Sequence, residues 1–138
     1  NSYAILPREH VLCLADVEGD LLTQLAAVLA VGGSAVWPES DISKALFARL
    51  PKDVQARIKR VADWHKDEVV FDAVLHHGHS DQLRGVCQQI AKRAGAIVGV
   101  QGLSQGETNI ALERLVIERA LSVNTAAAGG NASLMTIG

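Results

Sequence analysis

The sequence predicts an α/β fold in which a mostly parallel sheet lies between two layers of helices, followed by an extended carboxyl-terminal tail. Two observations support this prediction. Short apolar runs alternate along the chain with longer segments whose apolar residues recur at helical spacing. The apolar runs are continuous, which is typical of parallel strands covered by helices on both faces. With 138 residues, 49% of them hydrophobic, the chain has the size and apolar content of one domain.

The first strand and the first helix are predicted at residues 11–15 and 20–31. The first segment is a short apolar run, and the second has apolar residues at helical spacing. Acidic side chains before and at the start of the helix complement the free N–H groups of its first turn. Two glycines, Gly32 and Gly33, end this helix.

A second strand and a long helical stretch are predicted next. Residues 34–37 form an apolar run that Pro38 stops. Residues 41–64 have helical periodicity, and Pro51 is placed in the first turn of a second helix within them, where a proline is well tolerated.

The third strand is predicted at residues 71–75 and the fourth at residues 96–100. Between them residues 81–93 form a helix that Gly95 ends. A glycine-containing loop follows the fourth strand, and residues 109–117 are predicted as a short helix running into a strand. Right-handed crossovers between these strands give a Rossmann-like three-layer domain that lacks its final helix.

We predict an incoming linker at residues 1–10, the α/β domain at residues 11–109, and a carboxyl-terminal strand with a docking tail at residues 110–138. Residues 123–138 contain no charged side chain. Such a glycine-containing segment loses much backbone freedom on ordering, so we expect a partner surface to order it. Self-association through this tail remains an alternative. The predicted docking residues are Val123, Asn124, Gly129, Gly130, Asn131, Leu134, Met135 and Ile137.

Composition excludes several classes of function. A net charge of −2 and a pI near 6.2 are unlike the basic surfaces that bind nucleic acids. No apolar run approaches the roughly 18–20 residues of a membrane span. Cys13 and Cys87 are predicted to be reduced, buried thiols of a cytoplasmic protein. The common hydrolase, zinc-protease and P-loop motifs do not occur, so we predict no catalytic residues.

The turn after the first strand does not favour a bound dinucleotide. A pyrophosphate site needs glycines there, so that the backbone can approach the phosphates at a helix N-terminus. Residues 15–20 contain one glycine, Gly19, and three carboxylates, of Asp16, Glu18 and Asp20. Like charges about 4 Å apart repel by about 4 kcal/mol at an effective dielectric constant of about 20. We therefore predict that this chain binds no nucleotide cofactor.

Three histidines follow the third predicted strand. His76, His77 and His79 are weak candidates for a metal site, which Asp81 could complete. The simpler interpretation is a polar loop at the end of a strand. A regulatory module that senses a nucleotide or a metal is therefore kept as an alternative function.

The carboxyl-terminal residues resemble a known family. Residues 115–124, LVIERALSVN, and the following residues 125–135, TAAAGGNASLM, resemble the end of the proline utilization A family. Upstream segments at residues 6–8, 11–16, 20–32 and 80–84 resemble the same family, whereas residues 39–67 do not contribute.

This resemblance implies that the parent joins an FAD-dependent proline dehydrogenase to an NAD-dependent L-glutamate-γ-semialdehyde dehydrogenase. Some long members also carry an N-terminal DNA-binding domain. The resemblance further implies that this domain is a degenerate copy of an aldehyde dehydrogenase nucleotide domain. It would be non-catalytic, hold no cofactor, and pack on the aldehyde dehydrogenase module of the same parent. There its last residues would cover the cavity through which the intermediate is channelled. The parent is expected to be cytoplasmic, with its association with membranes left open.

Overall fold

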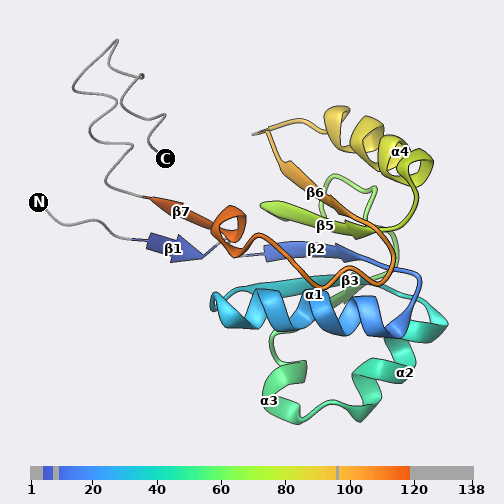
Figure 1. Cartoon of the computed structure of the whole chain (residues 1–138), viewed down its shortest axis with the longest axis vertical. Helices are drawn as coiled ribbons and strands as arrows, with labels where there is room; N and C mark the ends of the chain where they lie inside the picture. Colours follow the sequence, from blue (N-terminus) through green and yellow to red (C-terminus); the bar gives the residue numbers. More distant parts are fainter. Residues whose placement is uncertain (1–4, 8–9, 96, 119–138) are drawn as a thin grey trace, which may run out of the picture.

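A computed structural model describes residues 5–7, 10–95 and 97–118 of the chain. Five parallel strands form the central sheet in the order β4-β3-β2-β5-β6, with helices on both faces (Figure 1). The predicted α/β class is therefore confirmed. The elements of this body are β2 (His10–Leu14), α1 (Glu18–Ala30), β3 (Ser34–Pro38), α2 (Asp41–Arg49), α3 (Lys52–Gln55), β4 (Ile58–Val61), β5 (Ala73–His77), α4 (Ser80–Ala91) and β6 (Gly99–Leu103).

The strand order reverses beside β2. This strand pairs in parallel with β3 on one side and with β5 on the other. The chain therefore leaves β2 in one direction and later returns to its opposite side. In open parallel sheets, ligands bind outside the carboxyl ends of the strands at such a reversal. A binding site is therefore expected at the carboxyl ends of β2 and β5.

The core has two halves because successive side chains of a strand point to opposite faces of the sheet. Val11 and Cys13 of β2 pack with α1 on one face, whereas Leu12 packs on the other face, toward α4. Leu12 and Trp37 are both 0% exposed. The longest helix described is α1, with 13 residues. No helix in the described ranges has the length and apolar character needed to cross a membrane.

Within residues 41–64, the prediction of a second helix that starts at Pro51 is wrong beyond the first turn of that helix. Pro51 lies immediately before α3, but α3 has only four residues and is followed by the edge strand β4. In β4 the end residues Ile58 and Val61 are buried and the two charged residues between them are exposed. Apolar residues three positions apart also occur on one face of a helix, so this pattern alone could not distinguish the two structures.

Two other strands lie slightly later than predicted. The third predicted strand is β5 (Ala73–His77), and the fourth is β6 (Gly99–Leu103). The main-chain N–H of Asp72 donates to the carbonyl of His10, so Phe71 lies in the buried approach to the strand and not within it. As a result, two of the candidate histidines lie in a strand and not in a loop.

After β6 an extended segment takes the place of a helix. We name residues 104–115 the strap; it ends in a short 3-10 helix, η1 (Leu112–Leu115), and continues into β7 (Val116–Glu118). The strap runs from the carboxyl edge of the sheet to its amino edge, passing α1 (Figure 1). Its Ile110 and Leu115 are buried in the same half of the core as Leu21 and Leu25 of α1. The predicted short helix leading into a strand is confirmed.

The two ends of the described chain meet at the amino edge of the sheet. There β7 pairs antiparallel with β1 (Ile5–Pro7), forming a two-stranded ribbon (Figure 1). Residues predicted as an incoming linker therefore include a strand, which pairs with the start of the predicted carboxyl-terminal segment. The proposed domain boundaries stay a prediction, and residues 119–138, which include the predicted tail, lie outside the described residues.

The two cysteines, both predicted to be buried, differ in their exposure in the structure. Cys13 is buried in β2, but Cys87 is exposed on α4, so the prediction of two buried cysteines is wrong for Cys87. α4 is strongly amphipathic in sequence, yet Ile90 is its one buried residue. Burial raises the pKa of the Cys13 thiol to about 12, although the neighbouring Trp37 side chain partly opposes the shift.

This difference predicts selective alkylation. A shift of about three pKa units lowers the reactive thiolate of Cys13 roughly a thousandfold below that of an unshifted thiol near neutral pH. Iodoacetamide should modify Cys87 in the folded chain and Cys13 only after unfolding, as measured by peptide mass spectrometry. A folded Cys87→Ser variant should remain unlabelled, and rapid labelling of Cys13 in it would contradict the buried position of this thiol.

The same shift has a consequence at high pH. Because the pKa of Cys13 is higher in the folded state, its contribution to stability is complete below the unfolded pKa and is lost as pH rises toward about 12. Above pH 9 the free energy of unfolding should fall by up to about 1.4 kcal/mol per pH unit from this thiol alone. Cys13→Ala should remove that part of the pH dependence.

Candidate functional site

The candidate site is the crevice where the carboxyl ends of β2 and β5 meet the first turns of α1 and α4. α1 begins at Glu18, after the extended residue Val17, and no side chain caps its first turn with a hydrogen bond. Acidic Glu18 and Asp20 lie in that turn. A helix N-terminus at this position is where a dinucleotide-binding fold holds the pyrophosphate.

A buried polar pair fills the interior of the crevice. Gln24 and the side chain of His77 are both 0% exposed. Nε2 of Gln24 lies 2.9 Å from the carbonyl oxygen of Leu14 and 2.8 Å from Nδ1 of His77. Nε2 of His77 lies 2.8 Å from the carbonyl oxygen of Glu107. These partners assign the hydrogen of His77 to Nε2, which donates to Glu107, while Nδ1 accepts from Gln24.

The strap closes the mouth of the crevice. Oδ1 of Asp20 accepts a hydrogen bond of 3.0 Å from the main-chain N–H of Gly106. Gly106 has a φ of +87°, a left-handed conformation that glycine adopts without strain. The same carboxylate oxygen lies 3.9 Å from Nε2 of His77. Backbone groups of the strap therefore bind where the crevice would otherwise open to a ligand.

The outer rim of the crevice is occupied by α4. The side-chain oxygen of Gln82 accepts from the main-chain N–H of His79 at 2.8 Å, and its amide nitrogen donates to Asp16 at 3.4 Å. A Cβ on Gly78 would lie 2.3 Å from that oxygen and 2.9 Å from Cε1 of His76. The rim is therefore closely packed around the glycine between the histidines.

The structure does not bring the three histidines together as metal ligands. His77 engages protein groups through both ring nitrogens, and His76, its neighbour in β5, points to the other face of the sheet. Burial lowers the pKa of His76, an effect that the nearby carboxylate of Asp16 partly opposes. His79 precedes α4. Within the described ranges no three His, Cys, Asp or Glu residues are grouped as a metal site.

Sequence reasoning missed Gln24 of the crevice and the partner that Asp20 contacts there. Gln24 lies in the buried stripe that also contains Leu21, Leu25 and Val28, so a polar residue on an apolar helix face was the available signal. Asp20 was predicted as a carboxylate at the helix start that disfavours a phosphate, but its contact with Gly106, which is 86 positions away, was not predicted. Contacts of such separation have no local sequence pattern.

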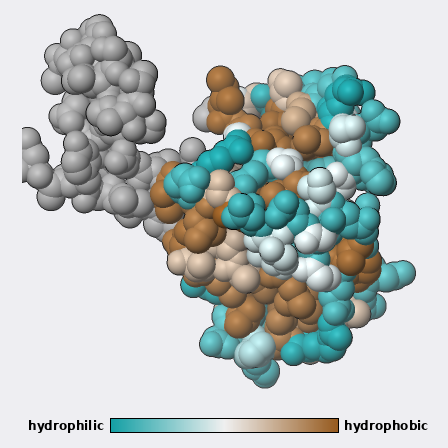
Figure 2. All heavy atoms as spheres, in the orientation of Figure 1, coloured by the Kyte–Doolittle hydropathy of each residue, from teal (hydrophilic) through white to brown (hydrophobic). Residues whose placement is uncertain are grey.

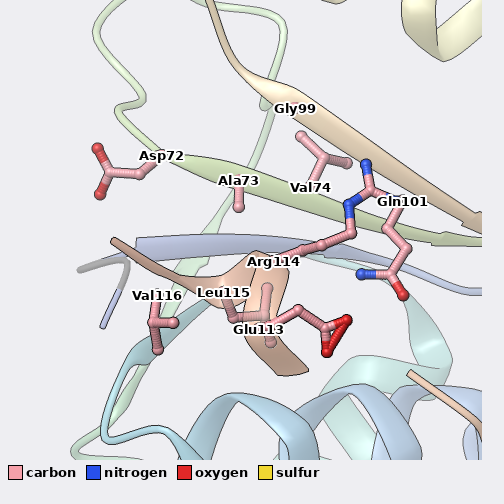
Figure 3. Close-up of a pocket in the computed structure, with 9 residues that line it drawn as sticks. All are labelled: Asp72, Ala73, Val74, Gly99, Gln101, Glu113, Arg114, Leu115 and Val116. Carbon is pink, nitrogen blue, oxygen red and sulfur yellow. The ribbon is translucent and has the colours of Figure 1, made fainter. Parts of the chain in front are cut away.

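A second hollow, a cleft of about 300 Å³, lies at the opposite, amino edge of the sheet. Figure 3 shows the side chains of Gln101 and Arg114 on one side of the cleft and Asp72 on the other. The side chain of Gln101 accepts from the main-chain N–H of Ala111 at 2.8 Å and donates to its carbonyl at 3.4 Å. The residues lining this cleft include no Ser, Thr, Cys or His nucleophile. Its polar groups mainly fix the strap to β6.

Apolar side chains also reach the surface. Over α1 and α2 they form several patches separated by polar groups (Figure 2), and Val17 and Leu22 of this region are 37% and 40% exposed. Beside the amino ends of β5 and β6, Val70 is 64% and Ile97 is 98% exposed. The predicted docking residues at 123–138 lie outside the described residues, so their role stays a prediction.

The fold and crevice define the class: a parallel α/β domain of dinucleotide-binding topology in which the strap occupies the β2–β5 side of the usual ligand position. A scan against models of protein families gives no match. Over all 138 residues the chain is 58% identical to the Bifunctional protein PutA of Escherichia coli (strain K12) and 60% identical to that of Salmonella typhimurium (strain LT2). It is 38% identical over 143 residues to the Bifunctional protein PutA of Rhizobium meliloti.

The chain spans about a tenth of these relatives, 10% of the first two and 12% of the third. The resemblance to the proline utilization A family is thereby confirmed. This chain is a homologue of one segment of PutA proteins.

Proposed function

We propose that this chain is a non-catalytic docking domain of a proline-oxidising PutA protein. It would pack on the aldehyde dehydrogenase module of the same parent, and residues 123–138 would cover the cavity that channels the intermediate. In this proposal FAD and NAD bind to other parts of the parent. The observation that supports it most is the crevice at the strand reversal, which is filled by Gln24, His77 and the strap.

The filled crevice argues against the nucleotide-binding alternative. A pyrophosphate at the first turn of α1 would have to displace the strap from Asp20. It would then face that nearly buried carboxylate, whose like charge is weakly screened in this position. Displacement would also remove the Glu107 carbonyl from His77. A nucleotide at this turn would therefore have to break the contacts that hold the strap to the domain.

The remaining surface supports docking as the function. Residues 120–138 contain no charged side chain but include apolar residues such as Leu134, Met135 and Ile137. In the described part of the domain, the apolar residues Val70 and Ile97 are exposed. Apolar residues that gather at a surface commonly mark a protein–protein contact.

Deletion of residues 123–138 from the full parent tests this proposal. The expected result is a lower rate of coupled proline-to-glutamate turnover, because the intermediate would escape to solvent. The proline dehydrogenase half-reaction, followed with an artificial electron acceptor, should be unchanged. A Gln88→Ala variant, altered on the exposed face of α4, is the control. Unchanged coupled turnover in the deletion would contradict the proposed cover.

A further inference from the structure

The strap is tied to the body of the domain at three points along its length. At the carboxyl edge, Asp20 accepts from the N–H of Gly106, and His77 donates to the carbonyl of Glu107. Nearer the amino edge, Gln101 makes a reciprocal pair of hydrogen bonds with the main chain of Ala111. A segment with no helical hydrogen bonds between residues 104 and 111 thus gains fixed positions from side chains of α1, β5 and β6.

Of these anchoring side chains, Asp20 relies most on its hydrogen bond to the strap. Its carboxylate is almost buried, and its second oxygen, Oδ2, is buried without a hydrogen-bond partner among the described residues. The bond from Gly106 is therefore the main compensation for placing this group in the interior. Charge-assisted hydrogen bonds are among the stronger ones in proteins, and an unsatisfied buried carboxylate is costly. Asp20 and the strap consequently stabilise each other.

The β1–β7 ribbon follows directly on the strap and lies at the amino edge of the sheet, opposite the edge where Asp20 contacts Gly106. Its ladder has three residue pairs, from Ile5↔Glu118 to Pro7↔Val116. A two-stranded ribbon is marginally stable by itself in water. The ribbon connects to the core on both strands: β1 leads into β2, and β7 follows η1, where Leu115 is buried, and beyond η1 the strap that Asp20 contacts.

We propose that Asp20 and Gln101 are positioning residues that hold the β1–β7 ribbon in place through the strap. They would thereby fix where the chain enters the domain and where the residues after Glu118 leave it. The crevice that binds a nucleotide in related topologies would here serve as a clamp for the chain's own backbone. The relevance of this clamp to docking rests on the proposed function, but the coupling between the two edges of the sheet does not.

Amide hydrogen exchange of the 138-residue chain tests the coupling. Asp20→Ala removes the acceptor for Gly106, and amides of residues 104–118 and of Leu6 should exchange roughly 10-fold to 100-fold faster, the range expected for losing a hydrogen bond to a charged group. Amides in β3 and β4, which the strap does not hold, should change little. Asp20→Asn retains an acceptor oxygen of the same shape and should stay within a few-fold of the unaltered chain.

Matched variants make this result decisive. Asp81→Ala removes an exposed carboxylate from the first turn of α4 and should leave the ribbon unchanged. Gln101→Leu releases Ala111 without touching α1 and should also accelerate exchange in the ribbon, which covers the case in which Asp20→Ala does not fold. Acceleration confined to residues 104–107, or equal acceleration across the whole domain, would overturn the coupling. Faster ribbon exchange with unchanged coupled turnover in the parent would overturn the docking function instead.

Discussion

Gln24→Glu is expected to destabilise the 138-residue chain by about 3–5 kcal/mol at neutral pH, the range for an uncompensated buried charge. Gln24 is completely buried, and its amide nitrogen donates to the carbonyl of Leu14 and to Nδ1 of His77. A glutamate has nearly the same shape. When it is ionised, however, its carboxylate oxygen replaces the N–H donor and faces two hydrogen-bond acceptors, the carbonyl oxygen of Leu14 and Nδ1 of His77. The measurement is the free energy of unfolding from urea titration, followed by circular dichroism.

The pH dependence identifies the cause of this effect. Burial raises the pKa of a carboxyl group in the folded state, because the charged form loses its hydration. The stability of the Gln24→Glu variant should therefore be greatest below the unfolded pKa of a glutamate and should fall as pH rises toward the higher folded value. The loss relative to the unaltered chain should shrink in acid.

Two further substitutions control for shape and for the change of residue type. Gln24→Met keeps the volume but removes the donor, and should cost less, about 1–3 kcal/mol. Gln88→Glu makes the same chemical change on the exposed face of α4 and should alter stability by no more than about 0.5 kcal/mol. If Gln24→Glu were as harmless as Gln88→Glu, the buried hydrogen bonds described for the crevice would be wrong.

The sequence predicted the features that depend on local pattern. Continuous apolar runs indicated buried parallel strands. The poor phosphate site indicated by the carboxylates after the first strand stays a prediction. The edge strand β4 was missed because Ile58 and Val61 have a spacing that also fits a helix. The amphipathic pattern of an edge strand with two exposed central residues is too short to decide between the alternatives.

The clamp could not be predicted in the same way because its partners are distant along the chain. Gly106 meets Asp20 across 86 positions, and Gln24 meets His77 across 53. Each of these residues had an adequate local explanation. Asp20 fitted an acidic helix start and Gln24 a polar position on a helix, whereas His77 and Gly106 fitted loops. The fold brings these residues together, and only then does the occupied crevice become apparent.

Leu115→Ala should be the most damaging of the simple truncations in the strap, with an expected loss of about 2–5 kcal/mol of stability. Leu115 is 1% exposed and packs in the half of the core that contains α1, where a helix would cover the sheet in a complete three-layer fold. Truncation removes its buried methyl groups and leaves a cavity beside β5. Since η1 leads directly into β7, the ribbon should loosen as well.

The same turn provides the control, because Leu112 is 42% exposed although it lies only three residues away in η1. Leu112→Ala is the identical chemical change and should cost less than about 1 kcal/mol, since little apolar area is buried there. Urea unfolding of both variants measures the difference. Equal losses of stability at the two positions would mean that η1 does not pack as described. A large loss at Leu115 alone would show that the strap, through η1, provides the apolar burial that a longer helix usually supplies.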